Sequence, residues 1–433
     1  MRVFYHTFGC KANQYDTERM RQESEARGAV TASERADADV VVVNTCTVTN
    51  QADADARRFI RRVRREMPEA RVVVAGCSAA LKEDTYRSMP GVAAVVPGHE
   101  PVAVAAAVEP ARLTQIELGS ALDRIDTEPI GGELLRSRRG ASRGWLKVQD
   151  GCDRKCSFCA TRLARGASRS RAPDDVIAEA RLLARGHAEI VVTGIHIGHY
   201  GLDLDPPASL SGLCARLLDA VPDARIRLGS IEATEIADAM VELIGGSGGR
   251  LAPHLHMPLQ SGADPVLRRM RRWHTREQYR VRALTIAERV QPLGLGADVI
   301  TGFPGERDRD HESTRALVEE LPFTYLHVFP FSPRDDTVAA SLADPVPQRV
   351  AGERARELRE LALEKGRVHR ARRLGGRASV VLEGDGSSGL TGDYLRIAVR
   401  GAGRDSGLVA GTLRSHGGDL YIDAPHEPRR IQA

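Results

Sequence analysis

GCDRKCSFCATRLARGASRSR, residues 151–171, is the stretch on which the interpretation of this chain depends. Cys152, Cys156 and Cys159 follow a C-x3-C-x2-C spacing, directly after a strand-like run at 145–148. Iron–sulfur clusters take Cys thiolate ligands, usually four for a 4Fe–4S cube. Three ligands leave one iron without a protein ligand, and an open position is where a metal centre does chemistry. The spacing therefore predicts a catalytic 4Fe–4S cluster held by these three cysteines.

A zinc knuckle or a chance group of cysteines in a loop is the alternative for this stretch. Structural zinc sites usually pair a C-x2-C with a second pair of Cys or His residues. No such pair follows nearby in the sequence. The pattern therefore favours the iron–sulfur cluster.

The C-x3-C-x-aromatic-C pattern, with Phe158 as its aromatic residue, resembles the signature of the radical S-adenosylmethionine (SAM) enzymes. In these enzymes the open iron binds the amino and carboxylate groups of SAM. The resemblance therefore implies SAM as a second cofactor, with Cys152, Cys156 and Cys159 as the catalytic cluster ligands.

Composition is that of a globular protein, with 42% hydrophobic and 28% charged residues in 433 positions. The first ten residues lack the apolar core of a signal peptide, and the longest apolar tract is far shorter than a membrane span. The seven cysteines, in a chain with no secretion signal, argue for metal chemistry rather than a disulfide framework. We therefore expect a cytoplasmic protein with no membrane contact.

Basic residues are clustered in particular segments of the sequence, although the net charge of the chain is only +4. Residues 136–171 hold eleven Lys or Arg against two acids, and 57–65 (RRFIRRVRR) hold six Arg. This distribution points to a polyanionic partner. For the 57–65 helix a solvated face is an equal alternative, since Phe59, Ile60 and Val63 form its inward stripe.

The first 130 residues predict a parallel sheet covered by helices on both faces. Val-rich strands at 3–8, 39–45 and 71–76 alternate with amphipathic helices at 13–27, 50–66 and 79–88. A cysteine follows each strand, namely Cys10, Cys46 and Cys77. Since ligand sites in parallel sheets lie at the carboxyl ends of the strands, we expect a second three-cysteine cluster site there. The alternative is three buried cysteines that act as small apolar residues.

TFGCKANQYDTE (7–18), NTCTVT (44–49) and VAGC (74–77) resemble the three ligand motifs of the methylthiotransferase N-terminal domain. The resemblance implies that Cys10, Cys46 and Cys77 hold an auxiliary 4Fe–4S cluster. Cys214, inside a helical pattern, matches no motif, and we expect it to pack in the core.

The central region predicts six strand–helix repeats, fewer than a complete eight-fold barrel. We expect a partial (β/α)6 barrel with an open side that suits a macromolecular substrate. The strands are predicted near 145–149, 189–195, 225–231, 253–257, 297–302 and 325–330.

Segments at the predicted carboxyl ends of these strands also resemble the methylthiotransferases, including GSIEATE, PHLHMPLQSG and TGFPGE. The resemblance implies that Gly194, Glu232 and Gln260 lie near SAM. For His254 and His256, packing inside the barrel is as good an interpretation as function. The chain departs from the family at ATRLARGASRSR, at Ala252, and at Asp335–Asp336, where a Gly or Pro is usual before Thr337.

A basic helix near 346–373 leads to a Gly-rich tail of short alternating runs, which predicts a small β-barrel. This tail resembles the TRAM domain, an RNA-binding module at the end of the family. Five arginines would follow a phosphate backbone there, namely Arg372, Arg373, Arg377, Arg396 and Arg400.

The chain is thus predicted to be an α/β protein with three domains. These are a methylthiotransferase N-terminal domain at 1–130, a radical SAM core at 138–368 and a TRAM-like RNA-binding domain at 370–433, with 131–143 as a linker. The opening TFGCKANQYDTE resembles most the branch that acts on N6-threonylcarbamoyladenosine next to the tRNA anticodon.

The resemblance implies that SAM cleavage produces a 5′-deoxyadenosyl radical, which abstracts the hydrogen from adenine C2 before the auxiliary cluster delivers a methylthio group. We expect tRNA and an electron donor such as flavodoxin or ferredoxin as partners, and a monomer. Three alternatives stay open: isopentenyladenosine in tRNA, a ribosomal-protein aspartate, and a non-catalytic iron–sulfur scaffold that binds RNA.

Overall fold

The computed structural model describes residues 1–109, 134–138, 140–402 and 407–424, so that the predicted linker at 131–143 lies partly outside the described residues. The described chain divides into two compact units. Unit 1 comprises residues 1–135, 149–169 and 332–340, and unit 2 comprises 136–148, 170–331 and 341–433. We describe each unit by itself.

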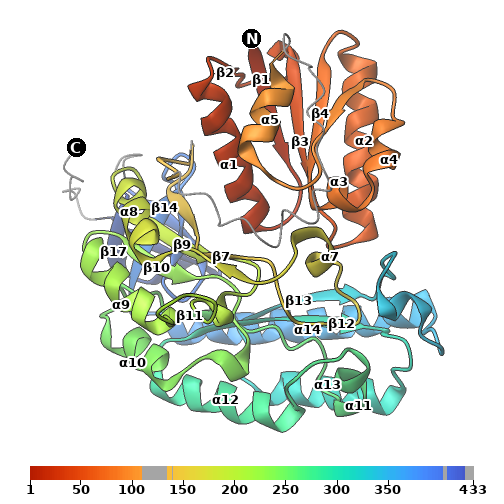
Figure 1. The fold of residues 1–433 in the computed structure, drawn as a ribbon. Helices are drawn as coiled ribbons and strands as arrows, with labels where there is room; N and C mark the ends of the chain where they lie inside the picture. The colour runs from red at the N-terminus through yellow and green to blue at the C-terminus, as the bar shows by residue number, and fades with distance from the viewer. Residues whose placement is uncertain (110–133, 139, 403–406, 425–433) are drawn as a thin grey trace. The chain divides into compact units, whose positions relative to one another are not determined.

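Unit 1 is built on a five-stranded parallel sheet in the order β2-β1-β3-β4-β5 (Figure 1). The central run Val40–Val43 is at most 1% exposed, because β-branched side chains on both faces of the strand are covered by helices. This confirms the predicted sheet and adds two short strands at its edges. The strands are β1 (Arg2–Thr7), β2 (Val30–Thr31), β3 (Val40–Thr45), β4 (Arg71–Gly76) and β5 (Val92–Val95).

Helices cover both faces of this sheet. Met20 of α1 and Val104 of α5 pack on one face, while Ile60 of α2, Ala79 of α3 and Tyr86 of α4 pack on the other. The bounds are α1 (Lys11–Ala26), α2 (Asn50–Glu66), α3 (Cys77–Leu81), α4 (Glu83–Arg87) and α5 (Pro101–Val108), with a 3-10 turn at Arg35–Asp37.

Two later segments complete unit 1. Residues 149–169 contain strand β7 (Gln149–Asp150) and the short helix α7 (Thr161–Arg165), and they end at β8 (Arg169–Ser170). Helix α7 packs against α3 of the N-terminal region. Residues 332–340 include most of a 3-10 turn at Val338–Ser341. Both segments therefore fold with the N-terminal sheet.

Unit 2 contains six parallel strands in two three-stranded sheets, β10-β9-β6 and β11-β12-β13. Parallel bridges from Ile226 to Leu251 and from Ser230 to His256 join the two sheets between β10 and β11. The result is the six-stranded open barrel predicted from the sequence. The strands are β6 (Arg143–Lys147), β9 (Glu189–Thr193), β10 (Arg225–Leu228), β11 (His254–His256), β12 (Gly294–Thr301) and β13 (Tyr325–Pro330).

Helices connect these strands and cover their outer side, as Figure 1 shows for α8 to α10, α12 and α13. Cys214 of α9 is fully buried, in agreement with the expected packing role. The helices are α8 (Pro173–Ala184), α9 (Leu210–Ala220), α10 (Asp238–Gly246), α11 (Asp264–Arg269), α12 (Arg276–Arg289), α13 (Asp308–Glu320) and α14 (Gln348–Arg373), with 3-10 turns at Ile197–His199 and Ala233–Glu235.

The C-terminal part of unit 2 is a six-stranded mixed sheet in the order β17-β14-β15-β16-β19-β18. Alternate side chains such as Val380, Leu382 and Ile397 are buried on one side of it, which is consistent with the predicted small barrel. The strands are β14 (Arg377–Glu383), β15 (Ser388–Thr391), β16 (Arg396–Arg400), β17 (Leu408–Thr412), β18 (Arg414–His416) and β19 (Asp419–Asp423).

Buried charges attach this sheet to the barrel. Arg225 and Arg227 of β10 share the carboxylate of Glu189, at 2.5 and 3.0 Å. Both guanidinium groups also donate to backbone carbonyls of the C-terminal sheet, at 2.8–2.9 Å. Asp393 accepts hydrogen bonds from His369 and Arg373 of α14, at 3.0 and 2.8 Å. These pairs are buried or nearly so, and they fix the C-terminal sheet within unit 2.

Candidate functional site

The three N-terminal cysteines lie at the carboxyl ends of three adjacent strands of the unit 1 sheet. Cys10 is the N-cap of α1 after β1, Cys46 directly follows β3, and Cys77 is the first residue of α3 after β4. Cys10 is exposed, while Cys46 and Cys77 are 3% and 6% exposed. The strand order alone therefore brings thiols from distant motifs to one edge.

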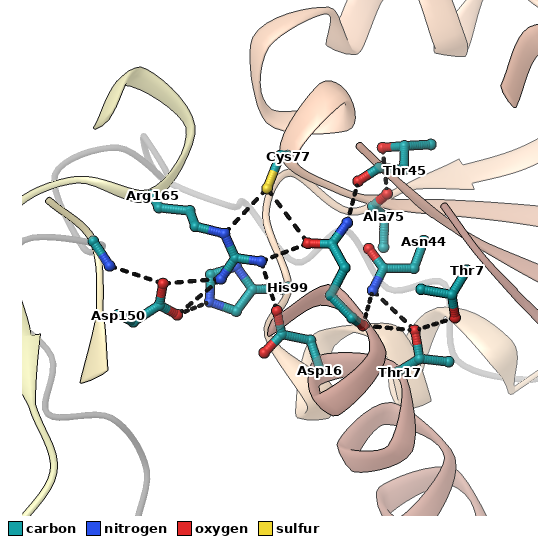
Figure 2. A network of polar contacts seen from close by, with 12 residues as sticks. Thr7, Asp16, Thr17, Asn44, Thr45, Ala75, Cys77, His99, Asp150 and Arg165 are labelled. Carbon is teal, nitrogen blue, oxygen red and sulfur yellow. Dashed lines mark hydrogen bonds and ion pairs between the residues drawn. The ribbon is translucent and has the colours of Figure 1, made fainter. Parts of the chain in front are cut away.

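Asparagine side chains hold the first two of these cysteine motifs together. Asn13 Nδ2 donates to the carbonyls of Phe8 and Thr45, both at 2.9 Å. Asn44 Nδ2 donates to the Asn13 carbonyl and to Thr17 Oγ1, again at 2.9 Å (Figure 2). The two buried amides thus tie the start of α1 to the carboxyl end of β3, which explains why asparagine stands beside the cysteines in both motifs.

Burial disfavours the thiolate form of Cys46 and Cys77 before a metal binds. It raises the pKa of Cys77 to about 12, an effect that the charge of Arg165 opposes and that the neighbouring Cys10 and Cys46 reinforce. Burial also raises the pKa of Cys46. A thiolate in this position needs a compensating cation, and metal coordination supplies one.

The second set of cysteines lies on the loop after β7. The Cys152 N–H donates to the Gly166 carbonyl at 3.1 Å, which closes the loop at its base. The Cys159 N–H donates to the Cys156 carbonyl at 3.2 Å, and the Thr161 N–H points at Cys159 Sγ at 3.4 Å. Burial raises the pKa of Cys152 to about 12, opposed by the backbone N–H of Arg154.

Arg165, the last residue of α7, links the cysteine loop to the N-terminal sheet and is fully buried. Its Nη1 donates to both carboxylate oxygens of Asp150, at 2.9 and 3.0 Å. Its Nη2 donates to Asn13 Oδ1 at 2.6 Å and to Asp16 Oδ2 at 2.7 Å, and its Nε donates to Cys77 Sγ at 3.1 Å (Figure 2). Both three-cysteine sets therefore belong to one hydrogen-bonded framework.

The segment 332–340 closes the same unit. Arg334, only 4% exposed, donates to Thr47 Oγ1, to Asn50 Oδ1 at 3.1 Å and to Asp53 Oδ2 at 3.3 Å. The Ala339 N–H donates to the Ser157 carbonyl at 2.8 Å, which fixes this segment to the cysteine loop.

This segment also explains a departure from the family pattern. Asp336, where Gly or Pro is usual, has a φ of +64°. Asp is among the non-glycine residues that best tolerate the left-handed region. Asp335 forms an ion pair with Lys82 Nζ at 2.8 Å. The substitution therefore preserves the turn.

Both cysteine sets fit an iron–sulfur cluster held by three thiolates. A Cβ on Gly9 would lie 2.5 Å from Cys46 Sγ, and Gly9 has a φ of +102°. A Cβ on Gly151, at φ +69°, would lie 1.7 Å from the Ala167 carbonyl oxygen. Only glycine allows the backbone next to Cys10 and Cys152 to approach so closely. Three thiols are the donor set expected for a cluster with one open iron.

The three residues expected near SAM follow adjacent strands of unit 2. Gly194 directly follows β9 and Glu232 closely follows β10, while Gln260 comes after β11. Glu232 is ion-paired with Arg272; burial raises the pKa of this carboxyl group, and Arg272 opposes the rise. Gln260 has a φ of +66°, and its backbone pairs with β12 through Asp298 O and Ile300 N, at 2.8 and 2.9 Å. Their contact with SAM stays a prediction.

The loops after β9 and β10 are joined by Glu235. It accepts from His196 Nε2 at 2.7 Å and pairs with His199 Nε2 at 3.2 Å. On β11, His254 and His256 are both hydrogen-bonded to the Tyr325 hydroxyl, at 2.8 and 3.1 Å. The two histidines are buried and share this hydroxyl group, which is consistent with packing inside the barrel.

Basic residues divide into buried and exposed groups. Arg165 and Arg171 of the basic stretch are buried and paired with carboxylates, Arg171 with Glu179 at 3.0 Å. These two arginines are not available to a polyanion, because their charge is already compensated inside the protein. Exposed arginines cover the outer face of α2 and the C-terminal module, among them Arg61, Arg62, Arg372 and Arg377.

Sequence reasoning missed Arg165, Asp150 and His99, whose Nε2 lies 2.8 Å from Asp150 Oδ2. One signal could have found part of this framework. Gly9 and Gly151 each precede a cluster cysteine, as Gly76 precedes Cys77, and a repeated Gly-Cys step indicates close backbone approach at a ligand.

Comparison with known proteins first defines the class. Residues 2–98 match the uncharacterized protein family UPF0004, and residues 146–318 match the radical SAM superfamily. A solved structure of the radical S-adenosylmethionine methyltransferase TsrM from Kitasatospora setae has a similar fold, with a TM-score of 0.58 at 17% identity over 78% of this chain and 77% of that chain. The class is therefore a radical SAM protein with an additional N-terminal sheet domain.

Sequence relatives then define the family. The chain is 37% identical to the threonylcarbamoyladenosine tRNA methylthiotransferase MtaB of Bacillus subtilis, over 82% of this chain and 79% of the relative. It is 34% identical to the protein of the same name in Thermotoga maritima, over 92% and 90%. The tRNA-2-methylthio-N(6)-dimethylallyladenosine synthase of Mycobacterium ulcerans is 34% identical over 93% and 77%. The chain belongs to the methylthiotransferase family of radical SAM enzymes.

Proposed function

We propose that this protein is a transferase that adds a methylthio group to C2 of N6-threonylcarbamoyladenosine next to the anticodon of tRNA. One observation carries the proposal: two sets of three cysteines lie in one compact unit and are joined by the Arg165 framework. A methylthiotransferase needs one centre to generate a radical and another to supply sulfur.

The relatives support the choice of nucleoside. The relatives named for threonylcarbamoyladenosine are 34–37% identical to this chain, and those named for dimethylallyladenosine are 31–34% identical. The opening motif at 7–18 favours the same branch. Isopentenyladenosine in tRNA and a ribosomal-protein aspartate are the competing substrates of the same chemistry.

Each cysteine set has a defined task in this proposal. Cys152, Cys156 and Cys159 would hold the 4Fe–4S cluster that supplies reductive cleavage of SAM, and Cys10, Cys46 and Cys77 the auxiliary 4Fe–4S cluster that supplies sulfur. The protein orients the reactants and excludes water from a radical reaction. Gly194, Glu232 and Gln260 would contact SAM from the carboxyl ends of β9, β10 and β11, where barrel active sites lie.

Substrate RNA would reach this site through basic surfaces. An anticodon-loop base is unpaired and can be turned into a pocket at modest cost. We assign RNA binding to a TRAM-like domain at 370–433, next to a radical SAM core at 138–368 and an N-terminal domain at 1–130. The enzyme would act as a cytoplasmic monomer and receive electrons from a flavodoxin or ferredoxin. Within the part of the chain that the structure describes, the helices are too short or too polar to span a bilayer.

Two measurements test the proposal. Anaerobically reconstituted protein with dithionite should convert SAM to 5′-deoxyadenosine, whereas a non-catalytic RNA-binding scaffold would leave SAM intact. Mass spectrometry of tRNA nucleosides from cells that lack the protein should show loss of 2-methylthio-N6-threonylcarbamoyladenosine. Persistence of that nucleoside, with loss of another methylthio product, would overturn the substrate assignment.

A further inference from the structure

The Arg165 side chain is unusual because all five of its N–H groups have an acceptor inside the protein. Two point at Asp150, two at Asn13 and Asp16, and the Nε–H points at the sulfur of Cys77. A guanidinium group has five donors in a rigid fork, so this arrangement fixes its position completely. The direction of the Nε–H towards Cys77 Sγ is therefore set by the two carboxylates and the amide.

The two carboxylates around this guanidinium carry more negative charge than the guanidinium carries positive charge. Arg165 carries one positive charge, and Asp16 and Asp150 carry two negative charges at 2.7 and 2.9 Å. His99 Nε2 lies 2.8 Å from Asp150 and disperses part of that charge. If Cys77 becomes a thiolate on binding iron, Arg165 is the cation within hydrogen-bond distance of it.

Hydrogen bonds to ligand sulfurs raise the reduction potential of an iron–sulfur cluster, because reduction adds an electron to an already anionic group. A charge-assisted N–H···S contact in a buried site acts with little screening by solvent. The same side chain ends α7, the helix that begins two residues after Cys159. Arg165 therefore connects the loop of one cysteine set to a ligand of the other.

We propose that Arg165 is a positioning residue of the auxiliary cluster, which fixes the sulfur of Cys77 and raises the reduction potential of that cluster. This inference rests on the proposed function, because it requires a cluster at Cys10, Cys46 and Cys77. A purely structural role for Arg165 would change stability and iron retention but would leave the potential unchanged.

The test uses the full-length chain with Cys152, Cys156 and Cys159 all changed to Ala, so that one cluster remains. In this background Arg165→Lys keeps a cation near Asp150 and Asp16 but removes the Nε–H. Arg162→Lys is the matched control, because Arg162 is exposed on the same helix. Each protein is reconstituted anaerobically, its iron is counted, and its reduction is titrated by electron paramagnetic resonance.

We expect Arg165→Lys to retain iron and to be reduced at least tenfold less readily, a fall of about 59 mV for one electron. Arg162→Lys should titrate like the parent. An unchanged midpoint in Arg165→Lys would overturn the inference. If Arg165→Lys does not retain iron, the double variant Arg165→Gln/Asp150→Asn, which keeps the net charge of the pair, is titrated in its place. Its midpoint potential should fall by the same amount, and an unchanged midpoint would again overturn the inference. A parent protein that binds no iron in this background would instead refute the auxiliary cluster, and with it the proposed function.

Discussion

Replacing Gly9 by Ala should abolish the auxiliary cluster and leave the SAM cluster in place. The added Cβ would lie 2.5 Å from Cys46 Sγ and 2.6 Å from Cys46 Cβ. Nonbonded heavy atoms prefer roughly 3.5–4.0 Å, so Cys46 must move by about 1 Å or more. A residue with a Cβ at φ +102° adds roughly 1–3 kcal/mol of backbone strain. The backbone strain at residue 9 and the displacement of Cys46 therefore both disturb the positions of the cysteine ligands.

Gly28→Ala is the matched control for this experiment. Gly28 has a φ of +89°, but a Cβ there would meet nothing within 4 Å. It therefore carries the backbone strain without displacing a ligand. After anaerobic reconstitution we expect about eight irons per chain in Gly28→Ala and about four in Gly9→Ala, with SAM cleavage retained in both. If Gly9→Ala also held the full iron content, the inference that the close approach of Gly9 to Cys46 is needed for the auxiliary cluster would be refuted.

Three further results are expected. Cys156→Ala should lose SAM cleavage while tRNA affinity, measured by filter binding, stays within about twofold; loss of both would argue that the cysteine loop itself binds RNA. Burial opposes the charge of Asp393, but hydrogen bonds from α14 hold its pKa at about 2, below the unfolded value of 3.8. The ionised carboxylate therefore contributes roughly 2 kcal/mol to the free energy of unfolding above pH 3.8, and this contribution is lost as the pH falls towards 2. Asp393→Asn should accordingly lower the thermal midpoint at pH 7. The difference in thermal midpoint between the variant and the parent should become smaller in acid. The double variant Arg372→Ala/Arg377→Ala should weaken tRNA binding and lower the slope of log Kd against log salt concentration by about 1 to 2. Arg309→Ala, at an exposed arginine, should leave that slope unchanged. Equal slopes in the double variant and the parent would exclude these two arginines from the tRNA interface.

The main elements of the fold could be predicted because local signals agreed with the tertiary structure. Helix α2 matches its predicted bounds, since Thr49 caps it and its apolar residues repeat at helical spacing. Strands β4 and β13 also match. Helix α5 was missed because PVAVAAAV is apolar on every side and shows no helical period. Helix α7 was missed because five residues cannot form a stable helix without tertiary contacts.

The cysteine ligands could be predicted from spacing, but the residues around them could not. Arg165 is one of many arginines in a basic stretch, and its partners Asn13 and Asp16 lie about 150 positions earlier in the chain. Nothing in the local sequence distinguishes it from the exposed Arg162. Its role depends on which strands become neighbours, which is a property of the folded unit.

The compact unit that holds the six cysteines of the two predicted cluster sites is assembled from three separate parts of the sequence, and the last part ends at residue 340. At a synthesis rate of about 5–20 residues per second, Cys10 is made roughly 15 to 70 s before the segment with Arg334 that closes the unit. Thiols of a nascent chain are open to oxidation during this interval. Cluster insertion should therefore be a late, post-translational step, and chains that stop before residue 332 should bind iron poorly although every cysteine ligand is present.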